Sequence, residues 1–232
     1  MDELKHCDFT SRDELDAALA AEVAAQLAAA IARRGEASLV VSGGSTPLQF
    51  FARLSVQQLP WEKVVITLAD ERWVAPDHAD SNERLLREQL LVNAAQAARF
   101  VPLKTADNSA EQAEQALGEA LASLPEFDVV ILGMGADGHT ASLFPCAEQL
   151  ERGLDLESTA ACIAVQPSTA AHQRMSLSLS RLLQSRQLIV HITGAEKKAV
   201  LETALREQDA CKWPIYAIVG QRKVPVALYW SE

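Results

Sequence analysis

The sequence predicts an α/β protein in which a mainly parallel sheet is covered by helices on both faces, giving three layers. Two observations carry this prediction. Short apolar runs typical of buried strands alternate along the chain with segments of helical spacing. In addition, 49% of the 232 residues are hydrophobic, and no internal repeat or low-complexity linker divides them, which favours one domain over residues 1–232.

Polar caps mark where helices begin in the first half of the chain. Ser11 and Glu14 have the spacing of a capping box, which predicts a helix to about Arg34. Thr46 and Pro47 predict an N-cap and a first helical residue, with a helix running toward position 59. Further helices are expected over 80–92 and after a cap at 109–112, and strands over 38–41, 63–70 and 128–132.

Apolar and alternating segments predict more strands in the second half. They are expected over 175–180, 187–194, 215–220 and 226–230, with a helix over 195–207. Strands that alternate with helices in this way are typical of a Rossmann-like sheet.

The charge of the chain disfavours some partners. With 31 acidic and 21 basic side chains, the formal net charge is -10, which repels phosphate backbones and anionic lipid. We therefore expect neither nucleic acid nor a membrane as a partner, and an anionic substrate would need a local basic site. The acidic N-terminus lacks the pattern of a signal peptide, and the Ala-rich run over 17–32 favours an amphipathic helix over a membrane span.

Cysteine and histidine spacing disfavours disulfides and metal sites. The four cysteines are far apart and form no C-x-x-C pair, which favours reduced thiols and a cytoplasmic location. The histidines are not spaced as metal ligands. The residues concerned are Cys7, Cys146, Cys162 and Cys211, and His6, His78, His139, His172 and His191.

Three loops with unusual chemistry follow predicted strands. They are Ser42–Pro47, Ala69–Trp73 and Gly133–His139. Ligands of a parallel α/β sheet bind beyond the carboxyl ends of its strands, so we expect these loops to meet and form the functional site.

The third loop contains the pattern G-x-G-x-x-G in Gly133, Gly135 and Gly138. In a dinucleotide site this pattern opens a long helix that faces pyrophosphate. Here Asp137 places a carboxylate in the turn, and Pro145 limits any following helix to about two turns. A dinucleotide is therefore disfavoured.

The same glycine turn is suited to hold His139 at the mouth of a strand. A histidine titrates near neutral pH and can take a proton from water. A lone histidine would more simply cap the next turn, but the nearby glycines, aspartate and polar loops favour a catalytic role. Asp137 is expected to orient the loop or the imidazole, or to form an Asx turn.

The loop after the first predicted strand has the features of an anion site. Gly43 and Gly44 allow a ligand to approach the backbone closely, and a helix begins at once. The hydroxyls of Ser45 and Thr46 are further donors. No Lys follows the second glycine, so this is not a Walker motif, and an ordinary turn with a Thr cap is the alternative.

Cations near these loops are candidates for binding an anion. Arg72 follows Asp70 and Glu71 and can pair with phosphate or carboxylate through a bidentate fork, or simply with Glu71 at the surface. Arg174 precedes a predicted strand. Lys197, or its neighbour Lys198, would oppose the helix dipole in a first helical turn, which indicates an anionic ligand unless it is ordinary surface decoration.

Five blocks of the sequence resemble the 6-phosphogluconolactonases, which share one superfamily with the glucosamine-6-phosphate deaminases. The blocks are VSGGSTP, LADERWV..DHADSN, ILGMGADGHTASLFP, RMSLSLSRLL and TGAEKKAVLE, in this order along nearly the whole chain. The lactonase branch is favoured by Arg72, where deaminases usually carry an aromatic residue, and by segments 80–82 and 142–145. Ser180-Arg181 departs from the family pattern, which has a proline ending that strand.

The resemblance implies the fold of that superfamily and hydrolysis of 6-phospho-D-glucono-1,5-lactone in the oxidative pentose phosphate pathway, without cofactor or metal. It implies that His139 deprotonates water and returns a proton to the ring oxygen. The phosphate would meet the 43–46 turn with Arg72, Arg174 and Lys197, and the oxyanion would meet glycine-loop N–H groups or Arg72. Asp70 would hold Arg72 or orient the sugar hydroxyls.

Other interpretations remain open from the sequence alone. A glucosamine-6-phosphate deaminase would release ammonia, and a regulator on this fold would bind a sugar phosphate without chemistry. A small sugar phosphate is the expected ligand in each case. The sequence leaves open whether the chain is a monomer or a homodimer.

Overall fold

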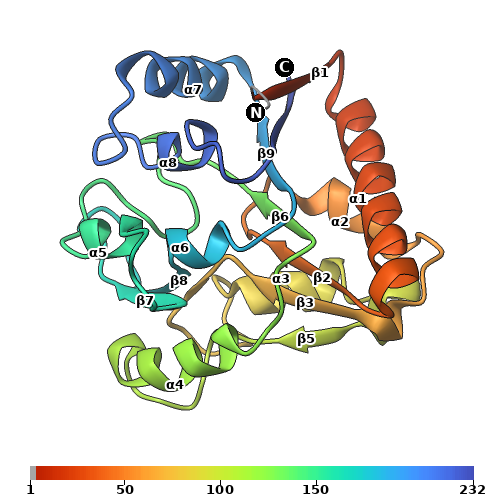
Figure 1. The fold of residues 1–232 in the computed structure, drawn as a ribbon, viewed down its shortest axis with the longest axis horizontal. Coiled ribbons are helices and arrows are strands. Elements are labelled where there is room, and N and C mark those ends of the chain that lie inside the picture. The colour runs from red at the N-terminus through yellow and green to blue at the C-terminus, as the bar shows by residue number, and fades with distance from the viewer. Residues whose placement is uncertain (1–3) are drawn as a thin grey trace.

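The computed structural model describes residues 4–232 and contains one large parallel sheet (Figure 1). Its strand order is β1-β10-β9-β6-β2-β3-β5, and every pairing within it is parallel. The strands are β1 (Lys5–Phe9), β2 (Ala37–Val41), β3 (Val64–Leu68), β5 (Arg99–Val101), β6 (Val129–Leu132), β9 (Leu188–Thr193) and β10 (Val226–Ser231). The predicted parallel α/β architecture is confirmed.

A second, smaller sheet was not predicted from the sequence. Its three strands are antiparallel, in the order β4 (Asp70–Arg72), β8 (Arg174–Leu177) and β7 (Cys162–Val165). The segment Asp70–Arg72 is therefore a strand of this sheet and not a loop. β4 begins two residues after β3 ends, so the chain passes directly from the large sheet into the small one.

Helices cover both faces of the large sheet, as predicted. Figure 1 shows α1 and α2 on one side, and α7, α8 and the small sheet on the other. The α-helices are α1 (Arg12–Arg34), α2 (Leu48–Ser55), α3 (Asn82–Gln89), α4 (Ala110–Ala122), α5 (Leu150–Leu154), α6 (Leu179–Leu182), α7 (Ala195–Glu207) and α8 (Tyr216–Val219), and short 3-10 helices span Trp61–Lys63 and Asn93–Ala97.

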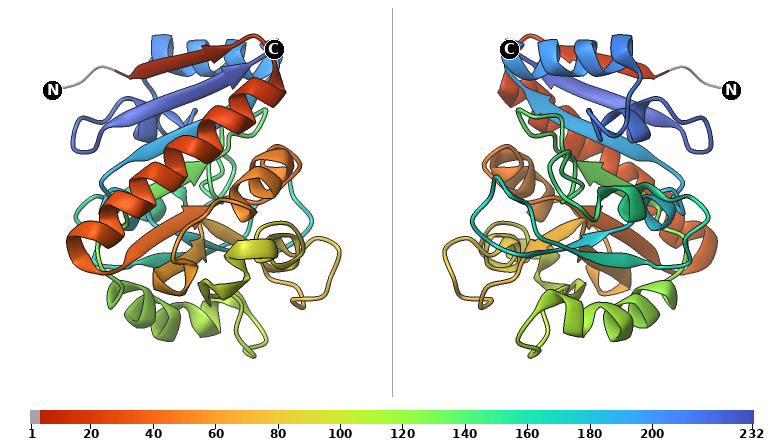
Figure 2. Two further views of the ribbon diagram at one scale, coloured as in Figure 1. Left: turned by 90° about the vertical axis from the view of Figure 1, so that its right-hand side faces the viewer. Right: turned by 90° about the vertical axis from the view of Figure 1, so that its left-hand side faces the viewer.

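The predicted cap of α1 is confirmed, and so is its amphipathic character. The Ser11 side chain accepts a hydrogen bond from the Glu14 N–H, and the helix ends at Arg34. Figure 2 shows α1 crossing the strands diagonally. Its length and composition would allow a membrane span, but one face is buried, with Leu15, Leu19, Val23 and Leu27 at 0% exposure.

Three element predictions were wrong at their ends or in type. The second helix begins after Pro47 without a side-chain cap from Thr46, and it ends at Ser55, whose hydroxyl donates to the Ala52 carbonyl. The strand expected over 175–180 ends at Leu177, because Ser178 caps a new helix. The segment 215–220 is the helix α8 and not a strand; Pro214 precedes it, and proline favours helix starts.

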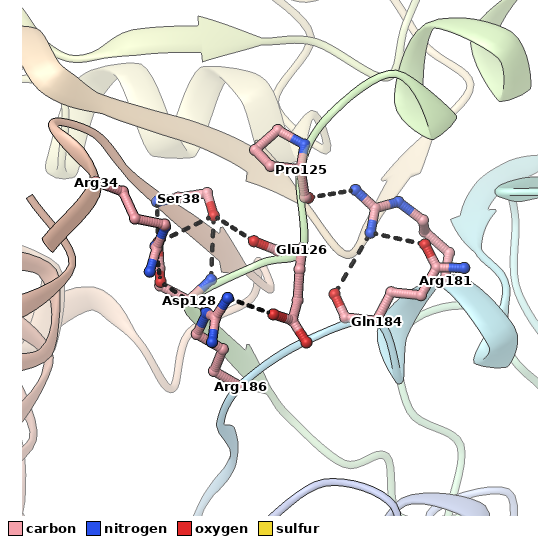
Figure 3. A network of polar contacts seen from close by, with 8 residues as sticks. All are labelled: Arg34, Ser38, Pro125, Glu126, Asp128, Arg181, Gln184 and Arg186. Atoms are coloured by element: carbon pink, nitrogen blue, oxygen red, sulfur yellow. Dashed lines mark hydrogen bonds and ion pairs between the residues drawn. The ribbon is translucent and has the colours of Figure 1, made fainter.

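The departure at Ser180-Arg181 lies in helix α6 and gives the fold a buried cation. Arg181 is 1% exposed, and Figure 3 shows its guanidinium turned toward the chain around Pro125. It donates to carbonyl groups in the last turn of α4, just beyond α4 and just beyond α6, namely those of Leu121, Leu124, Pro125 and Gln184. Burial lowers the pKa of Arg181 to about 10, and the carbonyl oxygens hold its charge in place.

A neighbouring network closes the amino ends of β2 and β6 (Figure 3). Asp128 accepts from the Ser38 N–H at 2.9 Å and pairs with Arg34 and Arg186. This network lies at the end of the sheet opposite the predicted site. We propose that residues 4–232 form a single domain, because one apolar core contains residues of both sheets.

Candidate active site

The loops at the carboxyl ends of β2, β6 and β9 meet in one cleft with a volume of about 620 Å³. The small sheet supplies a further wall through β4 and β8. Of the residues expected at the site, all but Gly138 line this cleft: Gly43, Gly44, Ser45, Thr46, Asp70, Arg72, Gly133, Gly135, Asp137, His139, Arg174 and Lys197. The three segments expected to meet, Ser42–Pro47, Ala69–Trp73 and Gly133–His139, do line one cleft, although the second contains strand β4 and is not a loop.

His139 and Asp137 form a close pair on the loop after β6. The carboxylate Oδ1 of Asp137 lies 2.5 Å from His139 Nδ1 and accepts the His139 backbone N–H at 3.1 Å. Both expectations for Asp137 therefore hold, since it forms an Asx-type turn and also orients the imidazole. With Nδ1–H donated to the carboxylate, Nε2 carries the lone pair that can accept a proton.

The environment of Asp137 keeps its carboxylate ionised. Burial by itself raises the pKa of Asp137, but the hydrogen bonds and the charge of His139 outweigh burial and lower the pKa below the ordinary value of 3.8. The side chain of His139 is 29% exposed. Because the Asp137 carboxylate is ionised and lies next to the partly exposed His139 ring, it is suited to stabilise the imidazolium that forms when His139 takes a proton.

Two glycines of this loop make room for the pair. A Cβ at Gly135 would lie 2.1 Å from His139 Nδ1, so any side chain there would displace the imidazole. Gly138 has φ +76°, and a Cβ there would lie 2.8 Å from Trp213 Cε3. Gly133 differs from these two. A Cβ at this position would meet no heavy atom of the described residues within 4 Å, so no steric contact requires a glycine there.

Phe144 connects the imidazole to a buried cation. Its ring centroid is 4.1 Å from that of His139, and the guanidinium carbon of Arg174 lies 5.8 Å from the same ring. Phe144 is 5% exposed and its ring is tilted by 31° to the imidazole, so this contact restricts the movement of the imidazole on one side. The sequence block SLFP contained this residue, but nothing in its spacing indicated the contact.

Arg72 and Arg174 lie directly opposite each other on β4 and β8. Arg72 donates to the carbonyl of Asp80 at 2.7 Å, while its Nε is buried without a hydrogen-bond partner. Arg174 is 8% exposed, and burial lowers its pKa, against the opposing charge of Asp70. Like charges in a cross-strand pair are destabilising, so this arrangement is suited to an anion bound between them or beside them.

Asp70 is buried at the bottom of the same wall and does not contact Arg72. Its Oδ2 accepts a hydrogen bond from the Ser142 hydroxyl at 2.5 Å, and its side chain is 7% exposed. Arg72 is held by the Asp80 carbonyl instead. The structure therefore gives no contact through which Asp70 would hold Arg72, as one of its two expected roles required.

Glu71 holds the start of helix α3 rather than pairing with the Arg72 guanidinium. Its carboxylate accepts from the N–H groups of Arg72, Asn82 and Glu83 and from the Ser81 hydroxyl. Burial raises the pKa of Glu71, and these hydrogen bonds oppose it. Asn82, which the sequence did not single out as a site residue, then reaches the cleft.

The glycine turn after β2 packs closely against that asparagine. A Cβ at Gly43 would lie 1.9 Å from Asn82 Oδ1, so a side chain there would displace the Asn82 amide, whose Nδ2 donates to the Asp70 carbonyl. Gly44 has φ +93°, which also favours glycine. The turn is open to the cleft at Ser45 and Thr46, and their carbonyl groups accept hydrogen bonds from Arg12 on the far side.

The two adjacent lysines at the start of α7 point to different places. Lys197 lines the cleft, and its Nζ donates to the Met134 carbonyl at 2.7 Å. Burial lowers the pKa of Lys197, while the charges of Asp137 and Glu196 oppose this shift. Lys198 instead lies 3.6 Å from the centroid of the Trp230 ring and 3.7 Å from Asp8.

The fold brings together a group that the sequence did not predict: His78, Asp80 and His172. Their potential ligand atoms lie within 4.8 Å of one another. His172 Nε2 is 2.9 Å from Asp80 Oδ2, and His78 Nδ1 accepts the Asp80 N–H at 3.1 Å. Spacing in the sequence did not reveal this group, because His172 comes from a distant part of the chain; hydrogen bonds within the group already engage both imidazoles.

The chain matches the family model described as "Glucosamine-6-phosphate isomerases/6-phosphogluconolactonase" over residues 10–230. It belongs to this family. Relatives of this kind match nearly its full length. One is the 6-phosphogluconolactonase of Rhizobium meliloti (strain 1021), which is 45% identical over 224 residues, covering 96% of this chain and 97% of the relative.

Solved structures agree with this assignment. A crystal structure of a 6-phosphogluconolactonase from Shewanella baltica OS155 superposes with a TM-score of 0.97 at 47% identity, covering 100% of this chain and 99% of the other. A monomeric glucosamine-6-phosphate deaminase superposes with a TM-score of 0.81, covering 99% and 98%, but its 15% identity shows the shared fold alone. The superfamily expected from the sequence is confirmed.

Proposed function

We propose that this chain hydrolyses 6-phospho-D-glucono-1,5-lactone to 6-phosphogluconate, the second step of the oxidative pentose phosphate pathway. The relatives that match at high identity and coverage carry the name of this activity. The observation in the cleft that best supports it is the Asp137–His139 pair, which lies in the same cleft as Arg72, Arg174 and Lys197. A base and a set of cations are what an anionic lactone requires.

His139 is the proposed general base. Its Nε2 takes a proton from water, and the resulting hydroxide attacks the lactone carbonyl carbon. The tetrahedral intermediate then expels the ring oxygen, which receives the proton from the imidazolium, and the new carboxylic acid ionises. Asp137 stabilises the imidazolium throughout. Positioned general acid–base catalysis of this kind contributes about 10²–10⁴-fold to the rate.

The substrate phosphate is the proposed partner of the cations and of the glycine turn. The N–H groups and hydroxyls of Gly43–Thr46 supply neutral donors, and Lys197, Arg72 and Arg174 supply charge. Together these cations form a local basic site in the cleft, although the chain as a whole has a formal net charge of -10. The developing oxyanion has two sets of donors within the cleft, namely the glycine-loop N–H groups and Arg72.

Asp70 is the proposed ligand of a sugar hydroxyl rather than a catalytic base. In the deaminase branch an acid at this position moves a proton between carbon atoms, which lactone hydrolysis does not need. Here the carboxylate is already engaged by Ser142. A cytoplasmic location completes the proposal, and it is supported by four cysteines that are free of disulfides.

Acid release from freshly generated 6-phosphogluconolactone tests this proposal, measured against the uncatalysed background. Unphosphorylated gluconolactone is the control for the phosphate, and an ammonia assay on glucosamine 6-phosphate is the control for the deaminase branch. We expect rapid acid release that depends on the phosphate, without ammonia. Ammonia release, or equal rates on both lactones, would contradict the proposal.

A further inference from the structure

Three polar residues, Arg12, Asp16 and His191, form a connected group next to the Gly43–Thr46 turn and have no role in the proposed chemistry. Arg12 opens helix α1, where a cation opposes the helix dipole. Its Nη2 donates to the carbonyl oxygens of Ser45 at 3.0 Å and Thr46 at 2.8 Å. Its Nε is buried and unpartnered, 3.6 Å from Asp16 Oδ2. Arg12 therefore joins two groups: it forms an ion pair with Asp16 and donates hydrogen bonds to the loop.

Asp16 and His191 continue the group into the interior. Asp16 is 0% exposed, and neither carboxylate oxygen has a hydrogen-bond partner. Its Oδ1 lies 3.3 Å from Nε2 of His191, which is 2% exposed, packs edge-on against Phe50 and lines the floor of the cleft. A buried carboxylate with incomplete hydrogen bonding costs stability, so its presence here points to a role other than folding.

The geometry of the Ser45–Thr46 peptide gives that role. In a trans peptide the N–H points away from the C=O. Because Arg12 holds the Ser45 carbonyl, the Thr46 N–H is turned away from Arg12. Ser45 and Thr46 line the cleft and Arg12 does not, so we infer that this N–H is available to a ligand in the cleft. Without this contact the peptide would be free to rotate and to lose the N–H as a donor to a ligand.

We propose that Arg12 is a positioning residue for phosphate recognition, held in place by Asp16 and His191. It acts through the backbone of the glycine turn and does not touch the substrate. This inference rests on the proposed function, since it requires the substrate phosphate to bind at Gly43–Thr46. It adds to the direct cations Arg72, Arg174 and Lys197 a fourth basic residue that acts from behind the loop.

The test compares Arg12→Met with Arg53→Met. Arg53 of α2 is a matched control, because it forms an ion pair with Asp13, the neighbour of Arg12 on α1. The side chains of Arg53 and Arg12 are also similarly exposed, at 38% and 37%. Calorimetric titration with 6-phosphogluconate measures affinity, and steady-state assays measure kcat and KM on the phosphorylated and unphosphorylated lactones. Thermal unfolding of each variant checks that the fold is retained.

We expect Arg12→Met to weaken 6-phosphogluconate binding and to raise KM about tenfold or more, with kcat retained. On the unphosphorylated lactone kcat/KM stays as in the wild type, which a general loss of structure would not allow. Arg12→Lys recovers part of the affinity, because one ammonium replaces the single donating nitrogen. Asp16→Asn, which leaves Arg12 present but less firmly held, shifts affinity in the same direction by less.

Equal affinity for 6-phosphogluconate in Arg12→Met and Arg53→Met would overturn the inference while leaving the proposed function intact. An equal loss on both lactones would also overturn it, because the effect would not depend on phosphate. If the wild type itself did not distinguish the two lactones, the proposed function would fail, and this inference with it.

Discussion

Two arginines are almost completely buried, and they differ in what their guanidinium groups contact. Arg181 is 1% exposed and donates to several backbone carbonyls at the ends of α4 and α6 (Figure 3). Arg174 is 8% exposed and lines the cleft opposite Arg72; among the described residues it donates only from Nε, to the His172 carbonyl. Burial lowers the pKa of both.

The difference separates a cation that stabilises the fold from one that is suited to bind an anionic ligand. A buried guanidinium whose N–H groups are satisfied by carbonyls holds chain segments together. One that retains unpaired donors beside a second cation is unfavourable for the empty protein and favourable once an anion binds. Burial and a lowered pKa therefore do not identify a functional arginine; the partners of its N–H groups do.

The largest expected effect concerns stability. Arg181→Met leaves several buried carbonyl groups without a donor, and we expect the free energy of unfolding to fall by about 3 kcal/mol. Activity of the folded fraction should be unchanged, because Arg181 does not line the cleft. Denaturant unfolding and kcat/KM at a temperature below the transition measure both. Unchanged stability would remove the contrast between the two arginines.

The reverse pattern is expected for Arg174. Arg174→Met should raise KM for the phosphorylated lactone by roughly 10- to 100-fold, which is the loss of about one charge-assisted contact. The melting temperature should stay the same or rise, since repulsion with Arg72 is removed. A fall in stability as large as that of Arg181→Met would show that Arg174 is structural as well.

The lysine pair repeats the contrast at a smaller scale. Lys197→Met removes a cation from the cleft and should raise KM about tenfold, whereas Lys198→Met should change it by less than about twofold. Steady-state kinetics on both variants provide the comparison. A larger effect on KM from Lys198→Met than from Lys197→Met would mean that Lys198, and not Lys197, contributes the cation of the cleft.

The smallest effect is a pH dependence at Asp137. Its folded-state pKa lies below the ordinary value of 3.8, so its contribution to stability is present above that value and is lost as pH falls through the folded pKa. The side chain is 39% exposed, which limits the contribution to under about 1 kcal/mol. The stability difference between wild type and Asp137→Asn should thus shrink as the pH falls below about 4. A difference that grew below pH 4 would contradict this assignment.

Local patterns in the sequence were sufficient to predict five of the seven strands of the large sheet, whereas its two edge strands, β1 and β5, were missed. The caps at Ser11 and Ser109 have the side-chain hydrogen bonds expected of them, and the helix over 195–207 has the expected ends. Parallel strands buried on both faces appear as continuous apolar runs, and their carboxyl ends must share one edge. This is why the expected site residues were brought together.

The small sheet and the groups behind the cleft depend on contacts between distant segments. Asp70–Arg72 is three polar residues long and becomes a strand only by pairing with Arg174–Ser176, about a hundred residues later. Arg12, Phe144 and His191 carry no local signal, because their roles come from what they touch across the fold. Periodicity and capping report on neighbours in sequence and cannot detect such contacts.

The general-base role of His139 is tested most directly by measuring turnover and product affinity together in His139→Ala. We expect kcat on 6-phosphogluconolactone to fall about 10²–10⁴-fold. Affinity for 6-phosphogluconate should remain close to that of the wild type, because the proposed phosphate contacts lie on other residues of the cleft, namely Arg72, Arg174, Lys197 and the Gly43–Thr46 turn. Near-normal turnover in His139→Ala, with the protein folded, would contradict the proposed mechanism.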